Sequence, residues 1–190
     1  MSEVKNILLC GVGGQGTILA SKVLSAALVA AGFDVKMSEV HGMAQRGGSV
    51  TTQVRYGEKV FSPIIGRGAA DILVSFEAME ALRYLEFLRP GGKVIVNDYR
   101  IMPSTVLSGV DKYPENALEI VKGAADTLAI DAIGLAESLG SAKAMNIVLL
   151  GALIKAMGLE ALDWDAAVKK CVKPAFVELN LNAVKMGIGA

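Results

Sequence analysis

The sequence is poor in metal-binding side chains, since its 190 residues include two cysteines and one histidine. An iron–sulfur cluster takes four thiolates, and neither Cys10 nor Cys171 belongs to a CxxC pair of the kind that holds zinc. We therefore expect no metal site in this chain. Cys10 lies in an apolar stretch, so two buried, inert thiols are favoured over a disulfide between them.

The chain also lacks net charge, because 19 acidic side chains balance 19 basic ones. The chain therefore has no net positive charge to attract nucleic acid or an anionic membrane, and we expect neither as a partner. Residues 1–5 lack the basic region of a signal peptide, and the apolar run at residues 147–154 is too short to span a bilayer. These features predict a cytoplasmic protein.

Apolar residues are abundant, at 53% of the chain against 20% charged residues. This composition favours a subunit that buries part of its surface against a partner, although a monomer with a large core would have the same composition. A chain of this length forms one sizeable core, so we expect a single domain over residues 1–190.

The first 40 residues read as strand, turn, helix and strand. Residues 5–10 form a continuous apolar run typical of a strand buried on both faces, and a glycine-rich turn follows at residues 11–16. Residues 17–31 are rich in alanine and leucine and end before Gly32, which predicts a buried helix. Residues 33–39 read as the second strand of this βαβ unit.

Residues 49–55 alternate between apolar and polar side chains, and a turn separates them from a short apolar pair at residues 60–61. This pattern predicts a β-hairpin, so the sheet should be mixed but mainly parallel. Further strands are expected at residues 70–76, 93–97 and 126–130, with a short one near 105–107. Helices are expected at residues 77–88, 114–121, 131–139, 144–157, 164–172 and 174–185.

Together these elements predict a three-layer α/β/α Rossmann-like domain. The sheet core should occupy about residues 1–140, and a C-terminal helical extension about residues 141–190. Asp163 is a plausible N-cap of the helix at residues 164–172.

The glycine turn is the first candidate site. Gly11, Gly13 and Gly16 form a G-x-G-x-x-G pattern between strand and helix, where backbone N–H groups can hold a phosphate. Glu39 ends the second strand, where a dinucleotide-binding domain places the acid that binds a ribose hydroxyl. A nucleotide site, another anion site and a purely structural turn all remain open.

The segment at residues 39–48 is the second candidate site. It holds the single histidine, and His41 and Arg46 are the catalytic candidates, because histidine moves protons near neutral pH and arginine clamps anions. Neither has an acid–base partner at motif spacing, so a loop that contacts its own backbone or another subunit is the alternative. The cofactor-binding candidates of the two segments are Gly11, Gly13, Gly14, Gln15, Gly16, Glu39, Gln45, Gly47 and Gly48.

The two segments together resemble the gamma subunit or domain of the 2-oxoacid:ferredoxin oxidoreductases. Residues 41–48, His-Gly-Met-Ala-Gln-Arg-Gly-Gly, are most similar to the beta (small) subunit of indolepyruvate ferredoxin oxidoreductase. Residues 146–153 also resemble a helical segment of the family, and the resemblance covers the whole chain.

The resemblance implies oxidative decarboxylation of an aryl 2-oxoacid with coenzyme A to an acyl-CoA, with reduction of ferredoxin. It also implies that thiamine diphosphate and the iron–sulfur clusters belong to a large (alpha) subunit and that this chain is not active alone. Both glycine-rich segments should then face that subunit and close one wall of its thiamine or coenzyme A pocket. Arg46 would contact an anionic group, and His41 would orient substrate or partner.

Two other interpretations remain. One is a self-contained NAD(P)-binding Rossmann oxidoreductase or nucleotide sensor, and the other is a scaffold whose glycine loops serve assembly alone. Asn146 lies within an apolar helix, and we expect it to hydrogen-bond a loop rather than a ligand.

Overall fold

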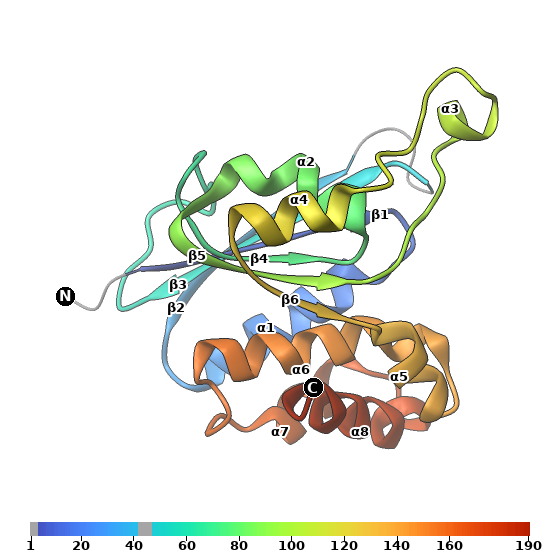
Figure 1. Cartoon of the computed structure of the whole chain (residues 1–190). Coiled ribbons are helices and arrows are strands. Elements are labelled where there is room, and N and C mark those ends of the chain that lie inside the picture. The colour runs from blue at the N-terminus through green and yellow to red at the C-terminus, as the bar shows by residue number, and fades with distance from the viewer. Residues whose placement is uncertain (1–3, 42–46) are drawn as a thin grey trace.

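The computed structural model describes residues 4–41 and 47–190, which form a six-stranded sheet in the order β2-β3-β1-β4-β5-β6 with helices on both faces (Figure 1). The strands are β1 (Lys5–Val12), β2 (Asp34–His41), β3 (Ser49–Gly57), β4 (Ala70–Ser75), β5 (Leu88–Asn97) and β6 (Asp126–Ile130). Continuous burial of β4, from Ala70 to Ser75, is what a strand covered on both faces requires. The prediction of a three-layer α/β fold is confirmed.

β3 runs antiparallel to both of its neighbours, β1 and β2, whereas β4, β5 and β6 add in parallel beyond β1. The sheet is thus mixed and mainly parallel, as predicted. The predicted hairpin partner of β3 is wrong. Val60 and Phe61 lie in a loop, and Phe61 is 86% exposed, because both sides of β3 are already paired with β2 and β1.

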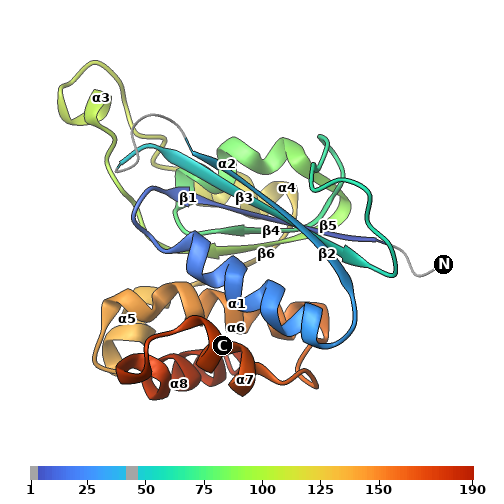
Figure 2. The same ribbon diagram turned by 180° about the vertical axis from the view of Figure 1, so that it is seen from behind.

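One face of the sheet carries α2 (Ala78–Tyr84) and α4 (Ala117–Ala124), and the other carries α1 (Thr17–Ala30) and α6 (Met145–Met157) (Figures 1 and 2). α6 is buried without a break from Met145 to Ile154, because the sheet covers one side of it and α8 (Val177–Ile188) the other. The remaining helices on that side are α5 (Ala132–Ser138) and α7 (Trp164–Cys171), with the 3-10 turns η2 (Ala142–Ala144) and η3 (Pro174–Phe176).

α6 and α8 approach each other closely through glycines. A Cβ added to Gly187 would lie 1.9 Å from the carbonyl oxygen of Val148, and one added to Gly151 would lie 2.3 Å from the carbonyl oxygen of Val184. Contacts this short leave no room for a side chain, so the glycines fix how the C-terminal helix packs. None of the described helices is long and apolar enough to cross a membrane.

Two segments differ locally from the predicted elements. The helix expected at residues 77–88 ends at Tyr84 and continues as a 3-10 turn, η1 (Leu85–Phe87), because Leu88 already pairs with Ala70 as the start of β5. The short strand expected near 105–107 is the single-turn helix α3 (Ser104–Leu107). The strand at residues 126–130 is confirmed, and so is the Asp163 cap of α7, whose carboxylate accepts a hydrogen bond from Ala166 N at 2.9 Å.

Candidate functional site

The two glycine-rich segments meet at the carboxyl end of the sheet, where β1, β2, β4, β5 and β6 end. Gly13 N donates to the carbonyl oxygen of Gly48 at 2.8 Å, and Gly47 N donates to the carbonyl oxygen of Gly13 at 3.4 Å. Gly14 and Gly16 have φ angles of +104° and +84°, which residues other than glycine rarely adopt. The turn after β1 and the segment before β3 therefore form one backbone-bonded unit.

Gln15 holds this turn to the neighbouring strand. Its Oε1 accepts a hydrogen bond from Val12 N at 2.7 Å, and its Nε2 donates to the carbonyl oxygen of Phe76 at 2.8 Å. The chain leaves β1 toward one face of the sheet and β4 toward the other, and such a switch point is where open α/β sheets bind ligands. The side chain of Gln15 bridges this switch point. A Cβ on Gly11 would lie 2.9 Å from Phe76 Cβ, so Gly11 allows a close approach within the protein.

Asn146 of α6 supports the turn from below. Its Nδ2 donates to the carbonyl oxygen of Gly16 at 3.0 Å, which confirms the expectation that this side chain bonds a loop. Only 3% of Asn146 is exposed, and its Oδ1 has no hydrogen-bond partner in the described part of the chain. A Cβ on Gly16 would lie 2.4 Å from Nδ2, so Gly16 is required by this contact as well as by its φ angle.

A pocket of about 360 Å³ lies beside the turn. Its lining combines the turn with the end of β2, including Glu39, although β3 separates β1 from β2 in the sheet. The N–H groups of Gly14, Thr17 and Ile18 have no acceptor among the described residues, which suits an anionic group. The lining residues are Gly13, Gly14, Gly16, Thr17, Ile18, Glu39, Val40, Val50, Thr51 and Thr52.

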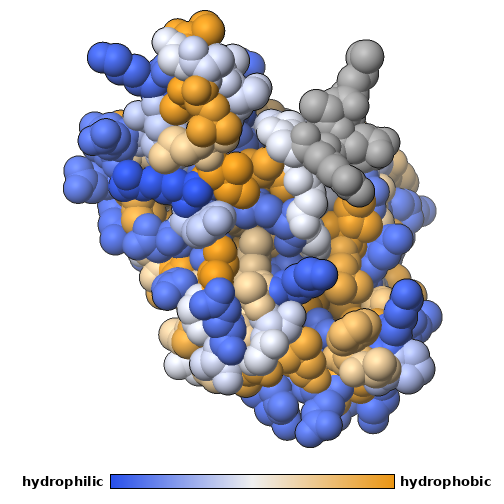
Figure 3. Space-filling view, turned by 90° about the vertical axis from the view of Figure 1, so that its right-hand side faces the viewer, coloured by the Kyte–Doolittle hydropathy of each residue, from blue (hydrophilic) through white to orange (hydrophobic). Residues whose placement is uncertain are grey.

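A second, more open hollow lies on the other side of the turn. Gly14, Gln15 and Gly16 line it together with Tyr99 and Ile101, which follow β5. Figure 3 views this end of the molecule and shows apolar residues over the α3 segment and across the middle of the face. The glycine turn therefore lies between two hollows on a face that carries both apolar and polar residues.

Glu77 and Glu80, at the start of α2, are buried carboxylates that hydrogen-bond neighbouring segments. Neither was among the site residues expected from the sequence. Glu80 is 2% exposed; its carboxylate accepts hydrogen bonds from Ser49 Oγ and, at 3.1 Å, from Arg83 Nε. Ser49 Oγ also lies 3.1 Å from the hydroxyl of Tyr84. The signal that could have found Glu77 and Glu80 is their position between the end of a buried strand and the first turn of the next helix, which is where α/β sheets collect polar residues.

The remaining candidates are only partly described. His41 ends β2, and its backbone pairs with Val50, but its side chain lies outside the described residues, as do Gln45 and Arg46. Gly47 has a φ angle of +81°. The catalytic roles of His41 and Arg46 stay predictions.

The cysteines are both free. Burial raises the pKa of the Cys10 thiol, which suits an inert side chain within β1. Cys171 is only partly buried, which corrects the expectation that both thiols are buried, because it ends α7 at the surface. Within residues 4–41 and 47–190, no group of three His, Cys, Asp or Glu side chains is placed to hold a metal ion.

The fold is that of the gamma subunits of oxoacid:ferredoxin oxidoreductases. The gamma subunit of keto/oxoacid ferredoxin oxidoreductase from Geobacter sulfurreducens PCA aligns with a TM-score of 0.75 and 26% identity, over 99% of this chain and 96% of that chain. Pyruvate oxidoreductase subunit PORC from Thermotoga maritima shares the fold with a TM-score of 0.74 and 22% identity, over 99% and 97% of the two chains.

Residues 6–190 match the family described as "Pyruvate ferredoxin/flavodoxin oxidoreductase", and the chain belongs to this family. The indolepyruvate oxidoreductase subunit IorB of Archaeoglobus fulgidus is 40% identical over 189 residues, which cover 96% of this chain and 92% of that protein. The subunit of the same name from Pyrococcus horikoshii is 39% identical, over 97% and 95%. The resemblance inferred from the two glycine-rich segments is confirmed.

Proposed function

We propose that this chain is the small subunit of a thiamine diphosphate-dependent 2-oxoacid:ferredoxin oxidoreductase acting on indolepyruvate or another aryl pyruvate. The observation that carries the proposal is full-length identity of about 40% to proteins named indolepyruvate oxidoreductase subunits. A 2-oxoglutarate synthase subunit, KorC of Methanothermobacter marburgensis, is only 29% identical over a similar length. The reaction would convert the oxoacid and coenzyme A to an acyl-CoA and carbon dioxide, and the electrons would pass to ferredoxin, in the cytoplasm.

The cofactors belong to a larger alpha subunit in this proposal. Thiamine diphosphate supplies the carbanion stabilisation that decarboxylation needs, and iron–sulfur clusters carry the electrons. The residues of this chain do not fit a cluster, because it has two cysteines, of which Cys10 is buried within the sheet. The chemistry therefore requires a partner polypeptide.

The contribution of this chain is one wall of the partner's site. In the pocket beside the glycine turn, the N–H groups of Gly14, Thr17 and Ile18, which have no acceptor among the described residues, suit a phosphate of coenzyme A, and Glu39 suits a hydroxyl group. Arg46 would contact an anionic group, and His41 would orient substrate or partner. The backbone bond between Gly13 and Gly48 supports this role, since it ties the turn to the segment that carries both side chains.

The alternative of a self-contained NAD(P)-binding oxidoreductase or sensor has one observation in its favour, because Glu39 and the glycine turn share a pocket. Two contacts argue against it. Gly13 N is taken by Gly48, and the side chain of Gln15 crosses the switch point where a dinucleotide would lie. A titration of NADH fluorescence with the isolated chain tests this directly. Saturable binding at micromolar NADH would favour the alternative.

The subunit role is tested with the complex formed from this chain and the large subunit. An aryl-pyruvate panel, with pyruvate and 2-oxoglutarate as comparison, is assayed for CoA-dependent reduction of a viologen dye. We expect aryl pyruvates to give the highest kcat/KM. A preference for 2-oxoglutarate or pyruvate would overturn the substrate class, and the absence of oxoacid oxidation would overturn the proposed function.

The role of Arg46 is tested in the same complex. Arg46→Ala should lower kcat/KM at least about tenfold, which corresponds to about 1.4 kcal/mol of transition-state stabilisation. The control is Arg67→Ala, whose side chain is 76% exposed and pairs with Glu86 away from the site. Both variants should form the complex in normal yield by gel filtration. Wild-type turnover in Arg46→Ala would exclude the proposed contact.

A further inference from the structure

Residues 99–113, here called the arm, connect β5 to α4 and project from the carboxyl end of the sheet (Figure 1). The arm carries the single-turn helix α3 near its tip. From 102 to 112, every residue of the arm is described and none is buried. Leu107 is 75% exposed and Val110 is 77% exposed, so these two apolar side chains pack on neither core of the domain.

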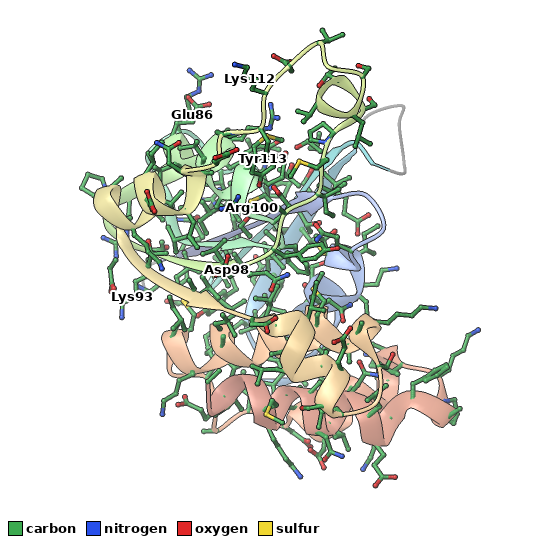
Figure 4. The ribbon with its side chains drawn as sticks, turned by 45° about the vertical axis from the view of Figure 1, so that its right-hand side comes forward. Glu86, Lys93, Asp98, Arg100, Lys112 and Tyr113 are labelled. Carbon is green, nitrogen blue, oxygen red and sulfur yellow. The ribbon has the colours of Figure 1, made fainter. Side chains whose placement is uncertain are left out.

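Both ends of the arm are held by one fully buried carboxylate. Glu77 is 0% exposed, and its Oε1 accepts hydrogen bonds from Ile101 N at 3.2 Å and from the hydroxyl of Tyr113. The guanidinium of Arg100 lies 5.8 Å from the centre of the Tyr113 ring, and Figure 4 shows these two residues where the arm leaves the body of the protein. The other oxygen of Glu77 accepts from Glu80 N at 2.9 Å.

This arrangement costs free energy to support residues 102–112, none of which is buried. Burying a carboxylate costs free energy unless hydrogen bonds replace its hydration, and here they are used to fix the two ends of an exposed arm. An arm whose base is already ordered loses less conformational entropy when its tip binds a partner. Exposed apolar side chains on such an element are typical of an interaction site.

The arm lies on the same face as the glycine turn. Tyr99 and Ile101, at its base, line the hollow that Gly14 and Gln15 also line. The space-filling view of this face shows the apolar surface of the arm above that of the body (Figure 3). Among the described residues, exposed large apolar side chains at this end of the molecule include Ile18 and Val40, which line the pocket beside the turn, and Tyr99, Met102, Leu107 and Val110 of the arm.

We propose that the arm is the docking element of this chain for the larger subunit and that Leu107 and Val110 enter an apolar pocket of that subunit. The inference rests on the proposed function, in which the same face is completed by the partner. A second copy of the chain is less suited to this face, because it would cover the glycine turn that the partner has to reach. In the 2-oxoglutarate:ferredoxin oxidoreductase from Magnetococcus marinus, this fold (TM-score 0.75, 18% identity) occupies 31% of a longer chain. There the fold is joined to further polypeptide of the same enzyme, which suits a larger subunit as the occupant.

The test measures binding of the full-length chain to the purified larger subunit by calorimetry. Leu107→Ser/Val110→Ser should raise Kd about 100-fold or more, as expected when anchor side chains are lost from an interface. The matched control, Val29→Ser/Phe61→Ser, changes side chains that are 55% and 86% exposed at the other end of the sheet, and should change Kd less than about threefold. Thermal denaturation of the isolated chains should be the same for all three proteins, because none of the four side chains is buried.

An unchanged Kd in the arm variant would overturn the proposal. It would also be overturned if the variant lost self-association, seen by sedimentation, while binding the larger subunit normally, since the occupant would then be a second copy. Oxoacid oxidation at saturating subunit concentration separates this proposal from the proposed function. If the wild-type complex lacks activity but the arm variant binds the larger subunit more weakly than the wild type does, the docking proposal is supported and the proposed function is overturned.

Discussion

The contact between Gly16 and Asn146 gives the sharpest test of the packing beneath the candidate site. Gly16 has a φ angle of +84°, and an added Cβ would lie 2.4 Å from Asn146 Nδ2. Gly16→Ala should therefore destabilise the chain for two separable reasons, backbone strain and overlap with the buried amide. Gly14→Ala is the matched control, because its φ angle of +104° brings the strain while nothing lies within 4 Å of the added Cβ.

The expected magnitudes follow from these contacts. Placing alanine in the left-handed region costs about 1–2 kcal/mol, which should be the whole effect of Gly14→Ala. The overlap in Gly16→Ala adds about 1–3 kcal/mol. Asn146→Ala removes one hydrogen bond worth about 1 kcal/mol, and this loss is partly offset because the unpartnered Oδ1 disappears as well.

The assay is urea denaturation of the single and double variants of the isolated chain. Because Asn146→Ala removes the atom that the new methyl group meets, the double variant with Gly16→Ala should be about 1–3 kcal/mol more stable than the sum of the single effects predicts. In a domain of this size each kcal/mol corresponds to about 2–4 °C in Tm. Additive effects would refute the reasoning, and so would equal losses in Gly14→Ala and Gly16→Ala.

Three further outcomes are expected. An alkylating reagent near pH 8 should label Cys171 and spare Cys10, because Cys10 is fully buried and burial raises the pKa of its thiol; equal labelling by peptide mass spectrometry would contradict this. Burial and the hydrogen bond to a buried carboxylate raise the pKa of Tyr113, so its stabilisation is complete below about pH 10, the ordinary tyrosine pKa, and is lost as pH rises toward the folded-state pKa. Tyr113→Phe should therefore flatten the alkaline loss of stability, and identical slopes of unfolding free energy against pH would contradict this. Gly187→Ala should destabilise the chain by about 1–3 kcal/mol because its methyl group meets a backbone oxygen at 1.9 Å, whereas Gly189→Ala, with its nearest neighbours at 3.7 Å, should leave Tm unchanged.

Patterns among neighbouring residues in the sequence were sufficient to predict many of the strands and helices. The apolar run before Gly11 predicted β1, because a strand buried on both faces needs side chains of one kind throughout. Asp163 predicted the start of α7, since a cap depends on residues three positions apart. These elements are determined by neighbours in sequence, so a single sequence is enough to find them.

Long-range pairing was not predictable in the same way. The alternation in β3 predicted a strand, but its partners, β1 and β2, lie on both sides of it and were not encoded in the pattern. The carboxylate of Glu77 looked like the surface of an amphipathic helix. It is buried because Tyr113, 36 positions away, supplies a hydrogen bond that no local pattern reveals.

The antiparallel insertion of β3 explains why the two glycine-rich segments lie together. Because β3 lies between β1 and β2, its first residues arrive at the turn after β1, where the carbonyl oxygen of Gly48 accepts from Gly13 N. Ser49 is then fixed by Glu80 of α2, and the backbone of His41 pairs with Val50. One end of the segment is therefore bonded to the glycine turn, and the other end is paired with β3. If Arg46 contacts a partner's ligand, as proposed, the hydrogen bonds of Gly47 and Gly48 to Gly13 hold the residues that follow it against the turn, which is expected of a subunit that completes a site in another polypeptide.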